Sequence, residues 1–213
     1  MNLDKIYLFA KNILEQDTTA HDWKHALRVE KNALAISPSN LSKKELDIIK
    51  ASCWLHDTID PKISTIHEIE LTDLEDLLNA ADATSDDIKK ILYIIQNLSY
   101  SKNIETKREL DLLGQIVQDA DRLDAIGAIG IARAFYYGGS KGHQLYDDTL
   151  PRALDEITED NYRTQDSIVN HFYEKLLVLE HSMNTPQAKK MARVRTKRME
   201  YFLDDLFEEI GYQ

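Results

Sequence analysis

The apolar residues of the chain recur at helical spacing, and this pattern predicts an all-α fold. A first helix carries its apolar stripe on Ile6, Phe9, Ala10, Ile13 and Leu14, because residues three and four apart share one face of a helix. No segment shows the sustained alternation that is typical of a strand with one buried face. With only 7 Gly and 4 Pro in the chain, few positions interrupt the helices.

Turn and cap residues divide the rest of the chain into further helices. One helix is predicted from Asp22 to Ile36. Ser42 followed by Glu45 forms the capping-box pattern, which begins another helix that runs to about His56. The remaining helices are expected near residues 66–80, 85–98, 165–183 and 186–210.

Two stretches in the second half of the chain depart from this regular pattern. Residues 125–135, AIGAIGIARAF, contain one charged residue in eleven, which predicts a helix enclosed by others and the most buried stretch of the chain. Residues 138–162 lack periodicity and contain several glycines. A loop of that length is uncommon unless it is functional or mobile.

Composition narrows the class of protein. A length of 213 residues fits one domain. The net charge of −11 argues against binding to a nucleic-acid polymer or to a membrane surface. A single cysteine, Cys53, excludes an internal disulfide, and its apolar neighbours predict a buried thiol. No apolar run approaches the ~20 residues of a membrane span, and the start lacks a signal-peptide pattern. We therefore expect a soluble, cytoplasmic protein.

Candidate chemistry lies where His and Asp side chains follow apolar residues. His56 and Asp57 end the run IIKASCWLHD, and a buried polar group without a partner costs several kcal/mol. A divalent cation would satisfy both, since it binds imidazole nitrogen and carboxylate oxygen together. The alternative is a helix end that directs both side chains into solvent. His21 and His25 are four residues apart, which is a weak metal-ligand pattern.

A second polar cluster lies in the segment QDADRLDA. It contains Asp119, Asp121 and Asp124, with Arg122 inside the segment and Arg133 nearby in sequence. Three carboxylates beside an apolar segment need positive charge among them. Either the arginines supply that charge in ion pairs, or one aspartate is a metal ligand that the others support.

In chain order these residues are His, then His-Asp, then Asp, and the sequence resembles the HD-domain metal-dependent phosphohydrolase superfamily. The resemblance covers most of the chain. Within the superfamily, the chain resembles a bacterial single-domain HD subfamily that includes nucleoside triphosphate pyrophosphohydrolases. It rests on HDWKHALRV at 21–29, WLHDTIDPK at 54–62, QDADRLDAIGAIGIARAF at 118–135, YYGG at 136–139 and HFYEKLLVLEHSMNT at 171–185.

The resemblance implies a fold and its boundaries. We expect an all-α, HD-domain helical bundle with additional C-terminal helices, built as a single domain over residues 1–213. The metal-site core would span about 20–135, a loop would follow at 138–162, and the C-terminal helices would span about 165–210.

The resemblance also implies one divalent metal ion, with a ligand set of His25, His56, Asp57 and Asp121. Two neutral imidazoles and two carboxylates would neutralise a doubly charged ion. Two nitrogen and two oxygen donors suit Mn, Fe, Co, Ni or Zn, and suit Mg less well. Asp57 is implied as a catalytic residue too. Asp60, three residues further on, is expected to be the general acid or base; the alternative is a turn residue before a proline.

Phosphate binding requires cations close to the metal in this acidic protein. Lys62 is the first candidate because it follows the His-Asp motif closely, and Arg122 has the alternative of pairing with a neighbouring aspartate. The full set of candidate substrate-binding residues is Arg28, Lys62, Lys102, Arg122 and Lys175.

The expected activity is hydrolysis of a nucleotide, with a (deoxy)nucleoside triphosphate cleaved to a monophosphate and pyrophosphate. The alternatives are an alarmone hydrolase, a 5′-nucleotidase, or a catalytically silent regulator that binds nucleotide or metal. The expected partner is a small-molecule nucleotide, with no nucleic-acid polymer and no membrane. Formation of a homodimer is left open.

Overall fold

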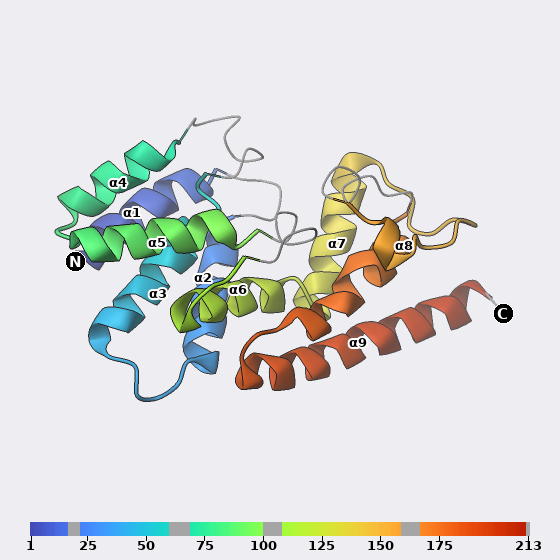
Figure 1. The fold of residues 1–213 in the computed structure, drawn as a ribbon. Helices are drawn as coiled ribbons and strands as arrows, with labels where there is room; N and C mark the ends of the chain where they lie inside the picture. The colour runs from blue at the N-terminus through green and yellow to red at the C-terminus, as the bar shows by residue number, and fades with distance from the viewer. Residues whose placement is uncertain (17–21, 60–68, 100–107, 159–166, 212–213) are drawn as a thin grey trace. The chain divides into compact units, whose positions relative to one another are not determined.

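The computed structural model in Figure 1 describes residues 1–16, 22–59, 69–99, 108–158 and 167–211. Within these ranges the chain forms helices and no β-sheet, so the prediction of an all-α fold is confirmed. None of the helices in these ranges is both long and apolar enough to span a membrane. The chain divides into two compact units, Met1–Asp121 and Arg122–Gln213, which are described separately.

The N-terminal unit is built around its third helix. That helix packs against the first, second and fifth helices, and the fourth packs against the fifth. Cys53 lies in this central helix and is fully buried, as predicted, and burial raises the pKa of its thiol well above its usual value. The helices are α1 (Leu3–Leu14), α2 (Trp23–Ile36), α3 (Lys43–Leu55), α4 (Leu71–Ala80), α5 (Ser85–Asn97) and α6 (Leu112–Asp124), whose last three residues belong to the other unit.

The predicted starts of α2 and α3 are confirmed by their caps. The Asp22 carboxylate accepts a hydrogen bond from the backbone N–H of His25 at 2.8 Å. At α3, the Ser42 hydroxyl accepts from the N–H of Glu45, and the Glu45 carboxylate accepts from the N–H of Ser42. These bonds satisfy donors that the first turn of a helix leaves unpaired.

Aromatic contacts fix α2 and α3 against α1. The ring of Tyr7 makes edge-on contacts with Trp23 and Trp54, at centroid distances of 4.7 Å and 5.3 Å. The indole N–H of Trp54 donates to the Glu30 carboxylate at 2.8 Å, which joins α3 to α2. Each tryptophan lies two residues before a histidine, His25 or His56, so this packing also positions both imidazoles.

The C-terminal unit packs its helices around a long last helix. Helix α9 contacts α7 and the short η4 helix, and Phe135, Phe172 and Phe202 form an aromatic cluster with centroids 5.6–6.1 Å apart. The elements are α7 (Gly127–Lys141), η2 (Leu154–Glu156), α8 (Ile168–His171), η3 (Phe172–Leu176), η4 (Leu177–Ser182) and α9 (Pro186–Ile210).

The prediction that 125–135 is the most buried stretch is wrong. Helix α7 exposes 42% of Ile129 and also leaves Ala128 exposed; the stretch is poor in charge because it is rich in small residues. The longest buried run in the described residues is Ala51–Thr58. Helix α7 also continues past Gly138 to Lys141, so the aperiodic segment begins later than expected.

Two other predicted helices differ in their details. The helix expected from about residue 66 begins at Leu71, although residues 66–68 lie outside the described ranges. The helix expected near 165–183 is a succession of α, π and 3-10 turns from Ile168 to Ser182. The last helix is confirmed, with Pro186 in its first turn, where a missing N–H costs nothing.

Candidate metal centre

Three helices of the N-terminal unit bring four polar side chains together. His25 lies in the first turn of α2, and His56 caps the end of α3, with Asp57 directly after it. Asp121 lies in the last turn of α6. The side-chain amide of Asn32 donates to the carbonyl of Ala120 at 3.2 Å, which holds α2 against the part of α6 that carries Asp121.

The donor atoms of these side chains are close to one another. The Nε2 atoms of His25 and His56 are 3.3 Å apart. The Nε2 of His25 lies 3.3 Å from an Asp57 oxygen and 3.4 Å from Asp121 Oδ1. The Nε2 of His56 lies 3.4 Å from the other Asp57 oxygen and 3.7 Å from Asp121 Oδ1. Each carboxylate therefore lies close to both imidazoles, which are close to each other.

These separations fit a shared metal ion. Ligand atoms about 2.0–2.2 Å from one ion, at angles between right-angled and tetrahedral, are about 2.8–3.6 Å from one another. The distances of 3.3–3.4 Å lie in the upper half of that range, and the 3.7 Å between His56 Nε2 and Asp121 Oδ1 lies just above it. Within the described residues, His25, His56 and Asp121 form a group whose donor atoms all lie within 4.8 Å of one another. The donor set suits a divalent transition metal.

The backbone fixes the orientation of one imidazole. The Nδ1 of His56 lies 2.8 Å from the carbonyl oxygen of Cys53. This geometry assigns the proton of the neutral ring to Nδ1, since the carbonyl can only accept, and directs the lone pair of Nε2 into the cluster. This role of the Cys53 carbonyl was not expected from the sequence. The position of Cys53, three residues before a histidine at a helix end, is the feature that indicates it.

The electrostatics of the cluster favour positive charge at its centre. Burial by itself lowers the pKa of His56, but the neighbouring Asp57 and Asp121 carboxylates outweigh burial and raise that pKa. Burial likewise raises the pKa of Asp121, but its hydrogen bonds to His25 and His56 outweigh this and hold its pKa well below the usual value. A cation at the centre would satisfy the same carboxylates.

The cluster is closed on one side and open on another. The side chain of His25 is 1% exposed and that of Asp57 is 11% exposed, whereas that of Asp121 is 35% exposed. An ion held here would be reached by water or ligand past Asp121. An open coordination position distinguishes catalytic metal sites from structural ones.

The neighbouring aspartates divide between the two alternatives that the sequence left open. Asp124 is 2% exposed at its side chain and forms an ion pair with Arg133, with 2.9 Å between Oδ2 and Nη1. Asp121 faces the imidazoles instead. The ion-pair alternative therefore describes Asp124, whereas the role of Asp121 as a metal ligand stays a prediction.

The structure describes only some of the predicted substrate-binding residues, and these lie in different parts of the chain. Arg28 is half-buried on α2, one turn after His25, and Lys175 is half-buried in η3. Arg122 donates from Nη1 to the carbonyl of Ser182 at 2.5 Å, within the C-terminal unit. Their roles in substrate binding stay predictions. Three predicted residues lie outside the described ranges: Asp60, Lys62 and Lys102.

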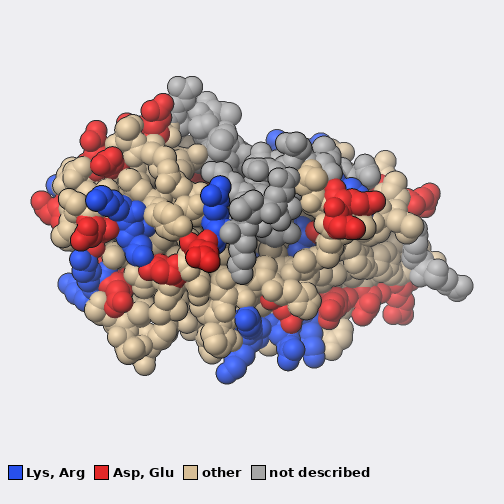
Figure 2. Space-filling view, viewed as in Figure 1, with Lys and Arg blue, Asp and Glu red and all other residues tan. Residues whose placement is uncertain are grey.

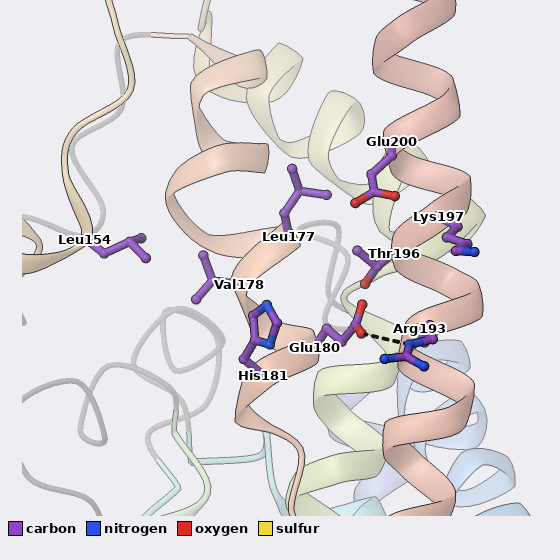
Figure 3. A pocket seen from close by; sticks show the side chains of 9 residues that line it. All are labelled: Leu154, Leu177, Val178, Glu180, His181, Arg193, Thr196, Lys197 and Glu200. Carbon is purple, nitrogen blue, oxygen red and sulfur yellow. Dashed lines mark ion pairs between the residues drawn. The ribbon is translucent and has the colours of Figure 1, made fainter.

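The C-terminal unit contains a hollow of about 480 Å³ that includes none of the cluster residues (Figure 3). Helix η4 lines it with both apolar and polar side chains, and α9 lines it with mostly charged ones. Arg193 of α9 pairs with Glu180 of η4 at 3.7 Å. Among the described residues, the donor atoms that converge closely enough for a metal belong to the cluster and not to this hollow. The lining residues are Leu154, Leu177, Val178, Glu180, His181, Arg193, Thr196, Lys197 and Glu200.

Comparison with known proteins identifies the family. The HD domain family matches residues 22–126, which include all four cluster residues. The chain is 41% identical to a crystallised protein of Lactobacillus plantarum, with a TM-score of 0.83 and coverage of 100% of this chain and 98% of that one. It is 38% identical to an HD-superfamily hydrolase of Bacillus thuringiensis, with a TM-score of 0.75 and coverage of 99% and 97%.

A third relative has been crystallised with a nucleotide. YpgQ of Bacillus subtilis, in complex with ADP, is 31% identical to this chain, with a TM-score of 0.75 and coverage of 98% of each chain. The chain belongs to the HD domain family, and it is an HD-family metal-dependent phosphohydrolase. The predicted family, fold class and enzyme class are confirmed.

Proposed function

We propose that this enzyme hydrolyses nucleotides, and that its substrate is a (deoxy)nucleoside triphosphate cleaved to a monophosphate and pyrophosphate. The observation that carries the proposal is a cluster in which two imidazoles lie 3.3 Å apart and each of two carboxylates lies 3.3–3.7 Å from both, with Asp121 partly exposed. The ADP complex of YpgQ supports a nucleotide as the ligand. The preference for triphosphates rests on the resemblance to pyrophosphohydrolases.

The proposed ligands are His25, His56, Asp57 and Asp121. A bound Mn, Fe, Co, Ni or Zn ion would lower the pKa of a coordinated water and polarise a phosphoryl oxygen. The carbonyl of Cys53 keeps the His56 proton on Nδ1, so the Nε2 lone pair remains directed at the cluster. Asp57 is buried beside both imidazoles, where substitution would leave Asp121 as the other carboxylate close to the two ring nitrogens.

The remaining residues are assigned to proton transfer and charge neutralisation. We assign to Asp60 the acceptance of a proton from the attacking water, whose oxygen bonds to the α-phosphorus as the bond to the pyrophosphate oxygen breaks. The substrate carries several negative charges, which an acidic protein must neutralise locally. We assign the neutralisation of these charges to Arg28, Lys62, Lys102, Arg122 and Lys175.

Phosphorus NMR on the Mn²⁺-loaded protein tests the proposal. Separate samples would contain a nucleoside triphosphate, a deoxynucleoside triphosphate, a nucleoside monophosphate and guanosine tetraphosphate. The proposal predicts pyrophosphate and monophosphate from the triphosphates. Hydrolysis in ¹⁸O-labelled water, with the label found in the monophosphate, would place the attack at the α-phosphorus.

The alternatives give different products. Orthophosphate from the monophosphate would identify a nucleotidase, and pyrophosphate from the tetraphosphate would identify an alarmone hydrolase. Binding of nucleotide with no product under Mn²⁺, Co²⁺ or Ni²⁺ would contradict an enzymatic role and support a regulator.

A further inference from the structure

The last helix has its charges segregated by sign. Residues 186–198 contain only basic charged residues, and residues 199–210 contain only acidic ones. Figure 2 shows this separation as a basic patch over the first half of α9 and an acidic patch over the second half. The basic residues are Lys189, Lys190, Arg193, Arg195, Lys197 and Arg198; the acidic ones are Glu200, Asp204, Asp205, Glu208 and Glu209.

This arrangement is unfavourable for α9 on its own. The helix dipole favours acidic residues near the N-terminus and basic residues near the C-terminus, yet α9 has no acidic residue in its first turn and no basic residue in its last. Arg193 also lies four residues from both Lys189 and Lys197, and like charges at that spacing repel. Contacts outside α9 must offset this cost. Glu180 of η4 supplies one of them within the same unit, since it pairs with Arg193 at 3.7 Å, and a partner molecule can supply others.

One face of α9 is available for such a partner. The helix buries Ala188, Ala192, Thr196, Met199 and Leu203 against its own unit. The opposite face carries an exposed stripe, which we call the outer stripe, and which includes two large apolar side chains that are 52% and 65% exposed. The outer stripe consists of Lys190, Arg193, Val194, Lys197, Arg198, Glu200, Tyr201, Asp204 and Glu208.

We propose that α9 pairs antiparallel with α9 of a second copy of this chain, through the outer stripe, to form a symmetric dimer. A two-fold axis beside Met199 brings the basic half of each helix against the acidic half of the other. A parallel pair would instead place like charges together. The facing pairs are Lys190 with Glu208, Arg193 with Asp204, Lys197 with Glu200, and Arg198 with Tyr201.

The register follows from the helical geometry. Helix α9 has 25 residues and is therefore about 37 Å long. The residues of each facing pair lie at nearly equal distances on either side of Met199 and on the same side of the outer stripe, at 100° per residue. Arg198 faces an exposed aromatic ring, which permits a cation–π contact. An unrelated acidic or basic partner would complement only one half of the helix, whereas a second copy complements both.

Charge exchange tests the pairing. One variant carries Lys190→Glu and Lys197→Glu, and the other carries Glu200→Lys and Glu208→Lys; each places like charges in contact with its own copy. Sedimentation should show at least a tenfold weaker self-association for each variant alone. An equimolar mixture should form a heterodimer, because every exchanged pair is then again of opposite charge.

A matched control separates this effect from net charge. Lys31→Glu with Lys89→Glu changes the net charge by the same amount as the first variant, at exposed positions outside α9, and should leave self-association unchanged. Circular dichroism checks that every variant keeps its helical content. The wild-type dimer should also weaken at least tenfold between about 50 mM and 500 mM salt, a test that needs no variant.

Three results would overturn the proposal. The first is a wild-type protein that stays monomeric at about 0.1 mM and low salt, where even weak complexes form. The second is dimerisation that both variants retain. The third is a mixture of the two variants that remains monomeric, which would contradict the antiparallel pairing.

Discussion

At the scale of single residues, His56 shows how backbone geometry prepares a side chain for chemistry. Its Nδ1 is held by the carbonyl of Cys53 at 2.8 Å, and its Nε2 lies among the donors of His25, Asp57 and Asp121. The ring is therefore fixed in both orientation and tautomer before any ligand binds. Such supporting contacts are worth 10–100-fold in metal affinity or activity in other metal sites.

Asp57→Asn tests the cluster directly. The substitution keeps the shape of the side chain but removes a negative charge 3.3–3.4 Å from two imidazole nitrogens. We expect a loss of about 100-fold or more in both Mn²⁺ affinity and kcat/KM, because a direct ligand contributes more than a supporting residue. Isothermal titration and a turnover assay measure the two effects. Asp76→Asn, at an exposed position of α4, should change neither.

Asp87 is predicted to make stability depend on pH. Burial alone raises the pKa of Asp87, but hydrogen bonding to Thr84 and the ion pair with Lys44 at 3.0 Å outweigh burial and lower it. A carboxylate with a lowered pKa in the folded state stabilises the protein above its unfolded pKa of about 4. That stabilisation is lost as the pH falls through the lowered folded pKa.

Asp87→Asn should therefore reduce the free energy of unfolding by about 1 kcal/mol at pH 7, as measured by urea denaturation. The difference from wild type should shrink below pH 4 and vanish once the wild-type carboxyl is protonated. An equal difference at pH 7 and at pH 2.5 would show that the charge of Asp87 has no role.

At the scale of elements, the ends of helices place the candidate ligands. His25 occupies the first turn of α2, His56 caps α3, and Asp121 lies in the last turn of α6. Helix ends suit this purpose because the chain turns away there and leaves space for a ligand. The cap of α2 and the capping box of α3 were predictable from Asp22, Ser42 and Glu45, since these residues act locally.

Other features of the elements depend on distant contacts and were not predictable. The sequence AIGAIGIARAF indicated an enclosed helix, yet Ile129 is 42% exposed, because low charge alone does not specify what packs around a helix. The continuation of α7 past Gly138 also depends on packing, since Ile168 lies where a side chain at that position would project. The residues next to Ile129 and Gly138 in the sequence do not indicate what packs against these positions.

Two glycines of α7 should respond to alanine in opposite ways. Gly127 has φ +77°, and a Cβ there would lie 2.9 Å from Cβ of Arg195, so Gly127→Ala should lower the free energy of unfolding by about 1–3 kcal/mol. Gly139 is exposed, and no atom of the described residues lies within 4 Å of an added Cβ. Gly139→Ala should raise stability by up to about 1 kcal/mol, as alanine favours a helix. Urea denaturation of both variants measures the contrast, and destabilisation by Gly139→Ala would contradict it.

At the scale of the whole molecule, the order of the His and Asp motifs was enough to indicate the family. Residues far apart in sequence, from His25 to Asp121, lie together because three helices of one unit converge. The division into the units Met1–Asp121 and Arg122–Gln213 was not predictable, because no composition change marks it and α6 runs across it. The single-domain organisation stays a prediction.

The candidate metal should also stabilise the N-terminal unit. Its ligands come from α2, α3 and α6, so an ion that binds only the folded state joins three helices. At a free Mn²⁺ concentration of 100 times its Kd, the free energy of unfolding should rise by about 2.7 kcal/mol. Calorimetry with and without Mn²⁺ measures this as a higher Tm. An equal rise in Asp57→Asn would show that the ion binds elsewhere.

The most direct test of the proposed metal centre is to measure metal content and nucleotide turnover on the same sample. The protein is stripped with a chelator, dialysed, and titrated with Mn²⁺ while bound metal and released pyrophosphate are both measured. If the metal centre catalyses the reaction, the stripped protein should show no turnover, and turnover should rise in proportion to occupancy up to a single ion per chain. Full turnover in the metal-free protein would contradict it.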